Sequence, residues 1–417
     1  MNKRAQRETN GALGQFCVRC HAPMAVRDNL TPDGLNLDQL PSSAKGVTCY
    51  FCHSAQAVDG THNNPLTLAT DGTMFASIAD PVAGAPHKSS YGTLHDPTHV
   101  DSARACGSCH DIVNPLGAAV ERTFQEWQGS IFAVPPRGLT CSQSCHVNER
   151  QVPVSNTTTK VRTFHSHTFA GVDVALTDFP EKEAQRAQVQ SVLDGALQST
   201  ICLDPVRKQI QVILDNAGAG HGFPSGATPD RRAWVELTAY QGDTVVYQSG
   251  HLGPEDTIET LADPDLWLIR DCIYDTNKVE TPFFWQAASL VNNQLPASVV
   301  NTVSDPTSFT KSHVETIYPA GGTKALDQIP DRITLKVHLK AIGDDVLAGL
   351  VASGDLDPSI PPLMPTLEPL GGTLEWTMAQ STPVTGAGSI VQYCVTPGTY
   401  RATPNRAQSH AHCPAPM

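Results

Sequence analysis

Four copies of a cysteine–cysteine–histidine motif lie close together near the start of this 417-residue chain. In three copies two residues separate the cysteines: Cys17/Cys20/His21, Cys49/Cys52/His53 and Cys106/Cys109/His110. In the fourth, "LTCSQSCHVN", three residues separate Cys141 from Cys145, and His146 follows directly. All four copies fall within residues 17–146, and so little chain per motif cannot build a conventional apolar core.

The spacing Cys-x-x-Cys-His is the attachment signature of c-type haem. Two thiols bond to one edge of the porphyrin, and the adjacent imidazole reaches the iron as its proximal ligand. The alternative for the regular copies is a set of zinc or disulfide cysteines that happen to precede histidine. We therefore predict covalently bound haem c, with proximal ligands His21, His53 and His110 in these copies.

The fourth copy keeps Cys145 and His146 adjacent, which is the part of the motif that sets the position of the iron. An extra residue between the cysteines can bulge outward without moving either sulfur far. The alternative is a local disulfide between Cys141 and Cys145. We interpret this copy as a haem site as well, which predicts four haem c groups.

Each iron needs a sixth ligand or an open position for chemistry. The sequence has 16 histidines and 6 methionines, so we expect a second histidine at every iron. The distal ligands are predicted to be His87, His95, His165 and His167. The reserve candidates are His221, flanked by glycines in "NAGAGHGFPSG", then His62 and His99. His338 is expected to face solvent, and surface positions are expected for His251, His313, His410 and His412.

Four cysteines lie outside the motifs: Cys202, Cys272, Cys394 and Cys413. An even remainder in an exported protein indicates disulfides, for which three connectivities exist. We favour Cys394 with Cys413 and Cys202 with Cys272; the alternative is four buried free thiols.

The sequence changes character near residue 171. A helix is predicted near residues 178–200, and alternating apolar patterns predict strands in "KQIQVILDN", "RAWVELTAYQGDTVVYQSG", "RITLKVHLK" and "TLEWTM". "DDVLAGLVASGD" predicts a short helix. The predicted fold is therefore multidomain. An irregular, short-helical tetrahaem cytochrome domain (1–170) precedes a mainly-β, antiparallel sandwich-like domain (171–417).

Charge and hydropathy exclude some partners. The net charge of −13 arises in residues 171–417, since residues 1–170 hold equal numbers of acidic and basic side chains. No basic stripe indicates nucleic acid, and no apolar run has membrane-spanning length. No apolar segment of a secretory leader follows the basic start, so we expect the precursor to begin upstream.

Several segments resemble multihaem c-type cytochromes: "FCVRCHAPM", "GVTCYFCH", "CGSCHDIVNP", "ERTFQEWQGSIFA", "HSHTFAGVD" and "GAGHGFPSG...RRAWVEL". The nearest group is the tetrahaem extracellular cytochrome nanowire subunits of the OmcE type. This resemblance implies bis-histidine haems and head-to-tail polymers that carry electrons outside the cell. The chain differs from that group in its length and its large β part.

Two classes of function remain. The first is an electron carrier without catalysis, extracellular or at the cell surface, with the periplasm as the alternative. It would relay electrons to redox partners or an extracellular acceptor, as a head-to-tail homopolymer in which a neighbour can donate an axial histidine. The second is a multihaem oxidoreductase, which needs an open haem and nearby acid–base groups. The surplus of histidine favours the carrier.

Overall fold

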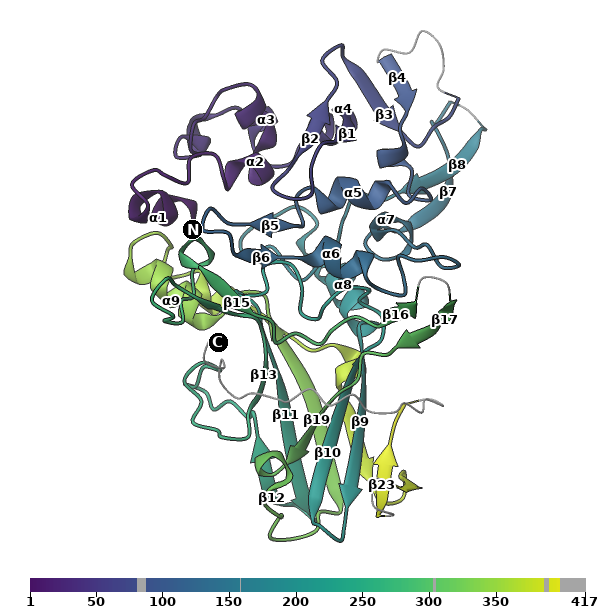
Figure 1. The fold of residues 1–417 in the computed structure, drawn as a ribbon, viewed down its shortest axis with the longest axis vertical. Coiled ribbons are helices and arrows are strands. Elements are labelled where there is room, and N and C mark those ends of the chain that lie inside the picture. Colours follow the sequence, from purple (N-terminus) through teal and green to yellow (C-terminus); the bar gives the residue numbers. More distant parts are fainter. Residues whose placement is uncertain (81–87, 158, 303–304, 386–389, 398–417) are drawn as a thin grey trace.

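The computed structural model describes residues 1–80, 88–157, 159–302, 305–385 and 390–397. The part of the chain that carries the motifs forms one end of the molecule, and long strands of the later part form the other (Figure 1). His87, His410, His412 and Cys413 lie outside the described residues.

The motif-bearing part consists of short helices and short hairpins. Its helices are α1 (Asn2–Glu8), α2 (Val18–His21), α3 (Pro23–Arg27), α4 (Cys49–Ser54), α5 (Ser102–Gly107), α6 (Thr123–Gln128) and α7 (Cys141–Ser144). Its strands are β1 (Ala55–Val58), β2 (Leu66–Leu68), β3 (Thr73–Ala76), β4 (Lys88–Tyr91), β5 (Ile112–Val113), β6 (Ala119–Glu121), β7 (Glu149–Pro153) and β8 (Val161–His165). Strands β1–β2, β5–β6 and β7–β8 pair antiparallel, whereas β3 and β4 pair parallel.

The later part is mainly β. Its helices are α8 (Lys182–Asp194) and α9 (Asp344–Ala352). Its strands are β9 (Leu197–Asp204), β10 (Gln209–Asn216), β11 (Arg232–Gln241), β12 (Thr244–Ser249), β13 (Trp267–Ile269), β14 (Cys272–Tyr274), β15 (Ser289–Val291), β16 (Val299–Thr302), β17 (Asp305–Thr310), β18 (Val314–Tyr318), β19 (Arg332–Lys340), β20 (Thr366–Leu367), β21 (Leu374–Thr377), β22 (Thr382–Thr385) and β23 (Val391–Val395).

Two antiparallel sheets form a sandwich. One has the strand order β18-β10-β9-β23-β22; the other has the order β12-β11-β19-β20, with β13 on β11 and β21 on β19. The predicted alternation places Ile210, Val212 and Leu214 of β10 and the alternate residues of β19 inward, all fully buried. These side chains belong to one apolar core between the sheets. The predicted hairpin turns at Gly242, whose φ of 57° is in the region that glycine adopts without strain.

The two parts share contacts, which begin at the N-terminus. Helix α1 packs on α9, and Ala5 lies in one buried cluster with Phe283 and Val346. The Arg4 guanidinium lies 3.9 Å from the centre of the Phe283 ring. Asn114, after β5, donates from Nδ2 to the carbonyl oxygens of Phe284 and Ala287, each at 2.7 Å. Residues 1–170 therefore pack against the later part of the chain. The domain boundary predicted at residue 171 stays a prediction.

Two sequence expectations about the later part are wrong in detail. The helix expected near residues 178–200 ends at Asp194, because the chain from Leu197 onward pairs with β10 as strand β9. His338 and His313 are buried, not solvated: His338 contacts Glu236 at 2.9 Å and His313 contacts Asp215 at 2.8 Å. His251 is half-exposed, as expected of a surface residue.

The expected disulfide pairing is also wrong. Cys202 is bonded to Cys394, and Cys272 is itself disulfide-bonded. The cause is sheet order: β23 adds to the edge of β9 in a register that places Cys394 directly opposite Cys202. The sequence-based prediction paired cysteines that are closer in the chain, whereas the Cys202–Cys394 bond joins residues 192 positions apart.

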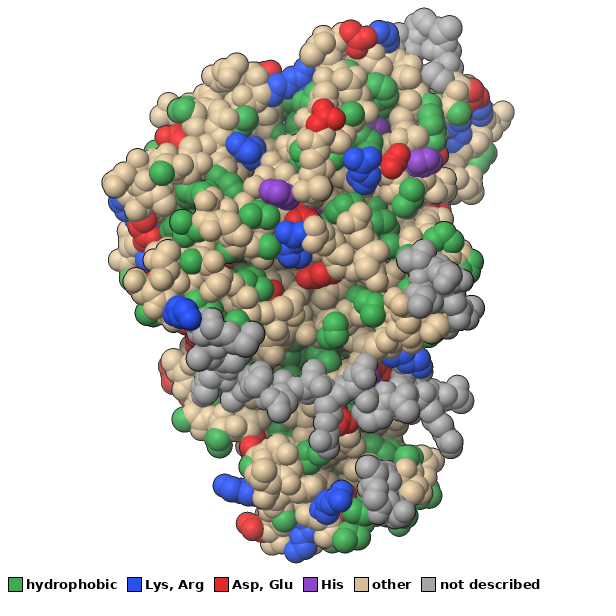
Figure 2. Space-filling model, viewed as in Figure 1, with side chains coloured by type: hydrophobic (Ala, Val, Ile, Leu, Met, Phe, Trp, Pro, Cys, Tyr) green, Lys and Arg blue, Asp and Glu red, His purple; other side chains and the backbone are tan. Residues whose placement is uncertain are grey.

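The face of the molecule in Figure 2 carries charges of both signs. Figure 2 shows Lys and Arg interspersed with Asp and Glu on the face it displays, and histidine side chains reach the surface over the motif-bearing part. Among the described residues, no helix is both long enough and apolar enough to cross a membrane.

Replacing both Cys202 and Cys394 with Ala should lower the free energy of unfolding by about 2–4 kcal/mol, because the bond closes a long loop between two core strands. Denaturant titration followed by tryptophan fluorescence measures the loss. Val384→Ala, an exposed change on neighbouring β22, is the control and should change the free energy of unfolding by less than about 0.5 kcal/mol. An unchanged midpoint in the double variant would contradict the expectation.

Candidate haem sites

The motif helices begin in the same way in the second and fourth copies. Thr48 and Thr140 stand directly before the first cysteine, and each side-chain oxygen accepts a backbone N–H three residues on, from Phe51 at 3.3 Å and from Gln143 at 3.1 Å. Such N-caps fix where a helix starts. The fourth copy therefore starts as a motif helix, although its spacing is longer.

The extra residue of the fourth copy is taken up inside the turn. In the first and third copies the histidine N–H donates to the carbonyl of the first cysteine, at 3.1 Å for His21 and 3.0 Å for His110. His146 makes the same bond to Cys141, at 3.1 Å, across one more residue. The turn is widened to an i→i−5 bond, as in a π-turn, and the histidine keeps its tie to the first cysteine. Cys141 and Cys145 are free thiols in the structure, not a disulfide.

The motif thiols lie next to one another in space. A hydrogen bond to Cys109 lowers the pKa of Cys20, and a hydrogen bond to Cys141 lowers the pKa of Cys106. The third motif therefore adjoins the first and the fourth. Within the described ranges, no three His, Cys, Asp or Glu side chains form a cluster that would hold a bare metal ion.

The rings of His146 and His221 lie at the separation that an iron between two imidazoles requires. Their ring centres lie 6.3 Å apart and their planes differ by 11°. A metal–imidazole bond of about 2 Å on each side of an ion separates two ring centres by roughly 6 Å. The Nδ1 of His146 lies 2.6 Å from the carbonyl oxygen of Ala170, and that of His221 lies 2.8 Å from the carbonyl oxygen of Gly222.

These carbonyl contacts fix the tautomer. When Nδ1–H donates to a carbonyl, the Nε2 lone pair is left for a metal. Burial lowers the pKa of His221 to about 4, so its ring is neutral, as a ligand must be. The donor set therefore fits a bis-histidine haem at the fourth motif. The structure places the reserve candidate His221, from the later part of the chain, beside His146.

His53 and His167 form a second facing pair. Their ring centres are 6.2 Å apart, with planes at 41°, and the Nδ1 of His53 lies 2.7 Å from the carbonyl oxygen of Phe75. This separation also fits two imidazoles on one iron. The structure thus places His167, a predicted distal ligand, opposite the second motif.

Two other predicted distal ligands have different surroundings. His95 stacks on His53 at 5.6 Å, but its Nε2 lies 2.8 Å from the carbonyl oxygen of Cys52. Its Nδ1 is buried without a hydrogen-bond partner among the described residues. His165 lies on β8 and its Nε2 contacts Glu149 at 3.1 Å. His87 lies outside the described residues.

His62 lies beside the first and third motifs. The loop that follows it is bonded to both: Asn64 donates from Nδ2 to the Arg19 carbonyl, and its backbone N–H donates to the Ser108 carbonyl at 2.5 Å. The Nδ1 of His62 contacts the hydroxyl of Thr61 at 2.9 Å, and its ring is exposed. The other reserve candidate, His99, precedes α5, and its Nδ1 accepts from the Asp101 N–H at 3.2 Å.

His110 has a carboxylate partner that sequence reasoning missed. Its Nδ1 lies 2.9 Å from Glu121 Oε1, and this hydrogen bond raises the pKa of His110 to about 9. A carboxylate behind a ligand histidine orients the ring and increases its basicity. Strand β6 places Glu121 opposite Ile112, two residues after the motif. The pairing of β5 with β6, not the local sequence, creates the contact.

Glu126 on α6 holds the loop that carries His221. Its Oε2 accepts from the Gly222 N–H at 2.9 Å and from the Ser225 hydroxyl at 3.2 Å, and burial raises its pKa. From the other side, Asn216 Nδ2 donates to the His221 carbonyl at 2.6 Å. The glycines around His221 were the sequence feature that indicated a tightly packed loop. The structure agrees, because a Cβ on Gly222 would lie 2.7 Å from the Gln294 amide nitrogen.

Comparison with known proteins supports the fold. No family model matches the chain, and no curated protein matches it. The chain is similar to the crystal structure of a penta-haem cytochrome c552 from Thermochromatium tepidum, with 18% sequence identity and a TM-score of 0.55. The match covers 87% of this chain and 83% of that chain, so the likeness in fold extends over both parts described above.

Replacing His221 with Ala should convert about one haem in four from low to high spin, because only His146 then remains at that iron. The high-spin optical band and the electron paramagnetic resonance spectrum of purified holoprotein measure the change. His251→Ala, a surface change in the β part, is the matched control and should leave the spectra unchanged. A fully low-spin spectrum in the His221 variant would contradict the assignment.

Glu126→Ala should weaken the same coordination without removing a ligand. It leaves the buried Gly222 N–H without an acceptor, at a cost of about 1–3 kcal/mol. We expect a partial high-spin signal that grows with temperature, and a Glu126→Gln variant, which keeps one acceptor oxygen, should restore most of the low-spin haem. A fully low-spin spectrum in Glu126→Ala at all temperatures would show that the loop does not need this contact.

Proposed function

We propose that this chain is a tetrahaem c-type cytochrome that relays electrons and performs no catalysis. The observation that carries the proposal is the facing pair His146 and His221. An iron held between two imidazoles has no coordination position left for a substrate. His53 and His167 support the same conclusion for a second site.

The chain's own residues would hold the groups in place. Eight motif cysteines, from Cys17 to Cys145, would bond the porphyrins, and four motif histidines would bind iron on one face. Backbone carbonyls of Phe75, Ala170 and Gly222 orient imidazoles by accepting from Nδ1. A haem bound at each motif supplies one-electron redox chemistry. The adjacent thiols of the first, third and fourth motifs support a relay with neighbouring groups.

The competing function is a multihaem oxidoreductase with one open haem. It requires a five-coordinate iron beside acid–base groups. Cyanide or nitrite added to the oxidised holoprotein distinguishes the two: a carrier keeps its low-spin spectrum, whereas an enzyme shows a high-spin band that shifts on ligand binding.

The haem count is the first test of the proposal. Intact-mass measurement of the wild-type protein should give four haems, and Cys145→Ala should reduce the covalent count to three. Val384→Ala in the sandwich should keep four. A wild-type count of three would remove the fourth motif from the set, and any other count would contradict the assignment of one haem to each motif.

We further propose that the chain forms head-to-tail polymers outside the cell or at its surface, with the periplasm as the alternative location. Exposed apolar side chains on the motif-bearing part could contact a second copy of the chain, which supports this proposal. They are Leu30, Leu35, Val47, Tyr50 and Ile78. A contact between unlike ends does not close and grows into a filament. The Cys202–Cys394 disulfide fits an oxidising compartment.

A donated histidine would couple polymerisation to coordination. His62 is exposed, so it is one candidate among the described residues for donation to a neighbour. His62→Ala should then abolish growth in light scattering while all haems stay attached. His251→Ala, a surface change in the β part, is the control. If wild-type protein at high concentration stays monomeric with every iron six-coordinate, the filament proposal is wrong and the soluble carrier remains.

A further inference from the structure

The ring of His110, the motif histidine of the third copy, contacts a carboxylate. Its Nδ1 lies 2.9 Å from Oε1 of Glu121, the last residue of strand β6. A carboxylate can only accept a hydrogen bond, so the proton between the two atoms belongs to Nδ1, and the Nε2 lone pair is left for an iron. The donor set of the third motif therefore fits a haem, as that of the fourth motif does.

The other motif histidines have no such partner among the described residues. The Nδ1 atoms of His53 and His146 contact backbone carbonyl oxygens, those of Phe75 at 2.7 Å and Ala170 at 2.6 Å. Within the described ranges, no Asp or Glu forms an ion pair with His21, His53 or His146. The third motif therefore differs from the others by a negative charge directly behind its histidine.

The hairpin of β5 and β6 holds Glu121 in place. Val120 is buried in a cluster with Ile273 of the sandwich part. Because successive side chains of a strand point to opposite faces, the burial of Val120 directs Glu121 toward the motif. The next residue, Arg122, lies with Nε 3.3 Å from Oδ1 of the buried Asp111. Two adjacent side-chain contacts thus join the end of β6 to the end of the motif.

The charge of Glu121 acts on His110 without a competing cation nearby. Its side chain is 14% exposed, so water screens the charge less than at a surface carboxylate. In the part of the chain that the structure describes, no Lys or Arg forms an ion pair with Glu121, whereas the neighbouring carboxylate of Asp111 is paired with Arg122. The charge behind His110 is therefore not neutralised by a neighbour.

A negative charge behind a ligand histidine lowers the reduction potential of a haem. The carboxylate makes the imidazole more basic, and a more basic ligand favours Fe(III) over the less positive Fe(II). Hydrogen bonds from the second shell and nearby charge are among the features by which proteins set haem potentials. A haem at the third motif should therefore be harder to reduce than haems whose histidines donate to neutral carbonyls.

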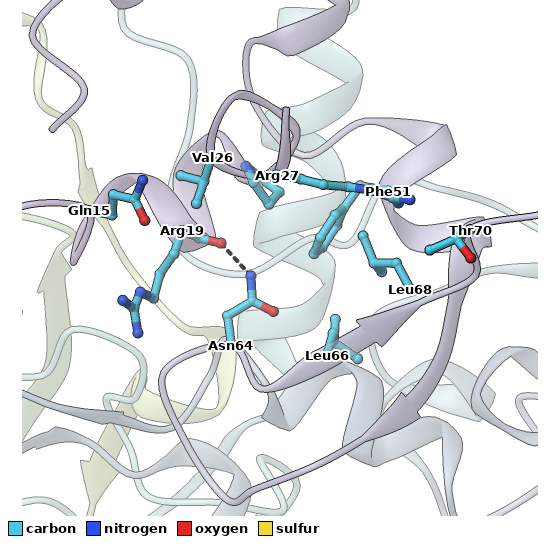
Figure 3. A pocket seen from close by; sticks show the side chains of 10 residues that line it. Gln15, Arg19, Val26, Arg27, Phe51, Asn64, Leu66, Leu68 and Thr70 are labelled. Atoms are coloured by element: carbon cyan, nitrogen blue, oxygen red, sulfur yellow. Dashed lines mark hydrogen bonds between the residues drawn. The ribbon is translucent and has the colours of Figure 1, made fainter. Parts of the chain in front are cut away.

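The third motif also lies between two others. Asn64 ties it to the first motif: its side chain donates to the Arg19 carbonyl of α2, as Figure 3 shows, and its N–H donates to the Ser108 carbonyl at 2.5 Å. On its other side, the thiol of Cys106 is hydrogen-bonded to that of Cys141 in the fourth motif. An electron that moves between the first and fourth motifs through nearest neighbours would therefore pass the third.

We propose that Glu121 is a positioning residue that makes the third haem the member of the relay with the lowest reduction potential. This inference rests on the proposed function, since it requires a haem at the third motif. It adds an order of potentials to the relay. The haem in the middle is reduced last, so an electron that crosses from the first haem to the fourth takes an uphill step there.

Redox titration of the purified holoprotein, followed by optical and electron paramagnetic resonance spectra, tests this role. Glu121→Gln keeps an acceptor oxygen for Nδ1 and removes the charge, so the third site then resembles the second and the fourth. The reduction equilibrium with the lowest midpoint should shift by about tenfold toward Fe(II), which raises that midpoint by about 59 mV. The other midpoints should move much less, and every haem should stay low-spin.

Glu236→Gln is the matched control. Glu236 lies on β11 of the sandwich and contacts His338 at 2.9 Å, so it is the same pair of groups at the same distance without a motif histidine. This variant should leave all midpoints unchanged. Glu121→Ala removes the hydrogen bond together with the charge and should raise the lowest midpoint at least as far as Glu121→Gln does. If one Glu121 variant does not bind four haems, the other decides.

Three results would overturn the inference. They are unchanged midpoints in a Glu121→Gln protein with four low-spin haems, an equal shift of all midpoints, and loss of a haem in both Glu121 variants. Failure of the relay is distinguishable, because it shows in the wild type as an open, cyanide-sensitive iron before any variant is titrated. A Cys109→Ala variant with the wild-type haem count would show that the third motif holds no haem, and would overturn both.

Discussion

The pair of His146 and His221 joins the motif-bearing part of the chain to the sandwich part. One imidazole belongs to a motif helix and the other to the loop after β10, in the sandwich part. The carbonyls of Ala170 and Gly222 fix the rings, and Glu126 ties the loop back to α6. The surroundings of the fourth motif therefore include residues from beyond the predicted boundary, and a haem bound there would be held by both parts of the chain.

Other contacts also join the motif-bearing part to the sandwich part. Helix α1 packs on α9, and Asn114 donates to the turn before β15. Inside the sandwich part, Arg232 is fully buried and is paired with Glu259 at 2.9 Å and Asp345 at 2.7 Å. A buried guanidinium needs such partners, because an unpaired charge in the interior is costly. Asp345 lies in the first turn of α9, so its ion pair with Arg232 connects the helix that packs on α1 to strand β11.

Sequence patterns predicted the structure correctly where the residues that determine it are close together in the chain. The alternation in β10 and β19 and the turn at Gly242 depend on neighbouring residues, and the structure confirms both. The patterns failed where distant segments meet. Cys202 lies opposite Cys394 only because β23 joins the edge of β9, and no spacing rule encodes that register. His338 alternates outward on its strand, but Trp234 and Glu236 of β11 lie against it.

The order of synthesis gives the His146–His221 contact a further consequence. All four motifs precede the sandwich in the chain, so their thiols leave the ribosome before the loop with His221 exists. The distal face of the fourth site can close only after β10 has been made, and its neighbour β18 follows about 100 residues later. Between attachment and closure, that site would carry an iron with one protein ligand. With a haem iron bound between the two histidines, maturation of the molecule would end with the sandwich, whose folding would supply the second ligand.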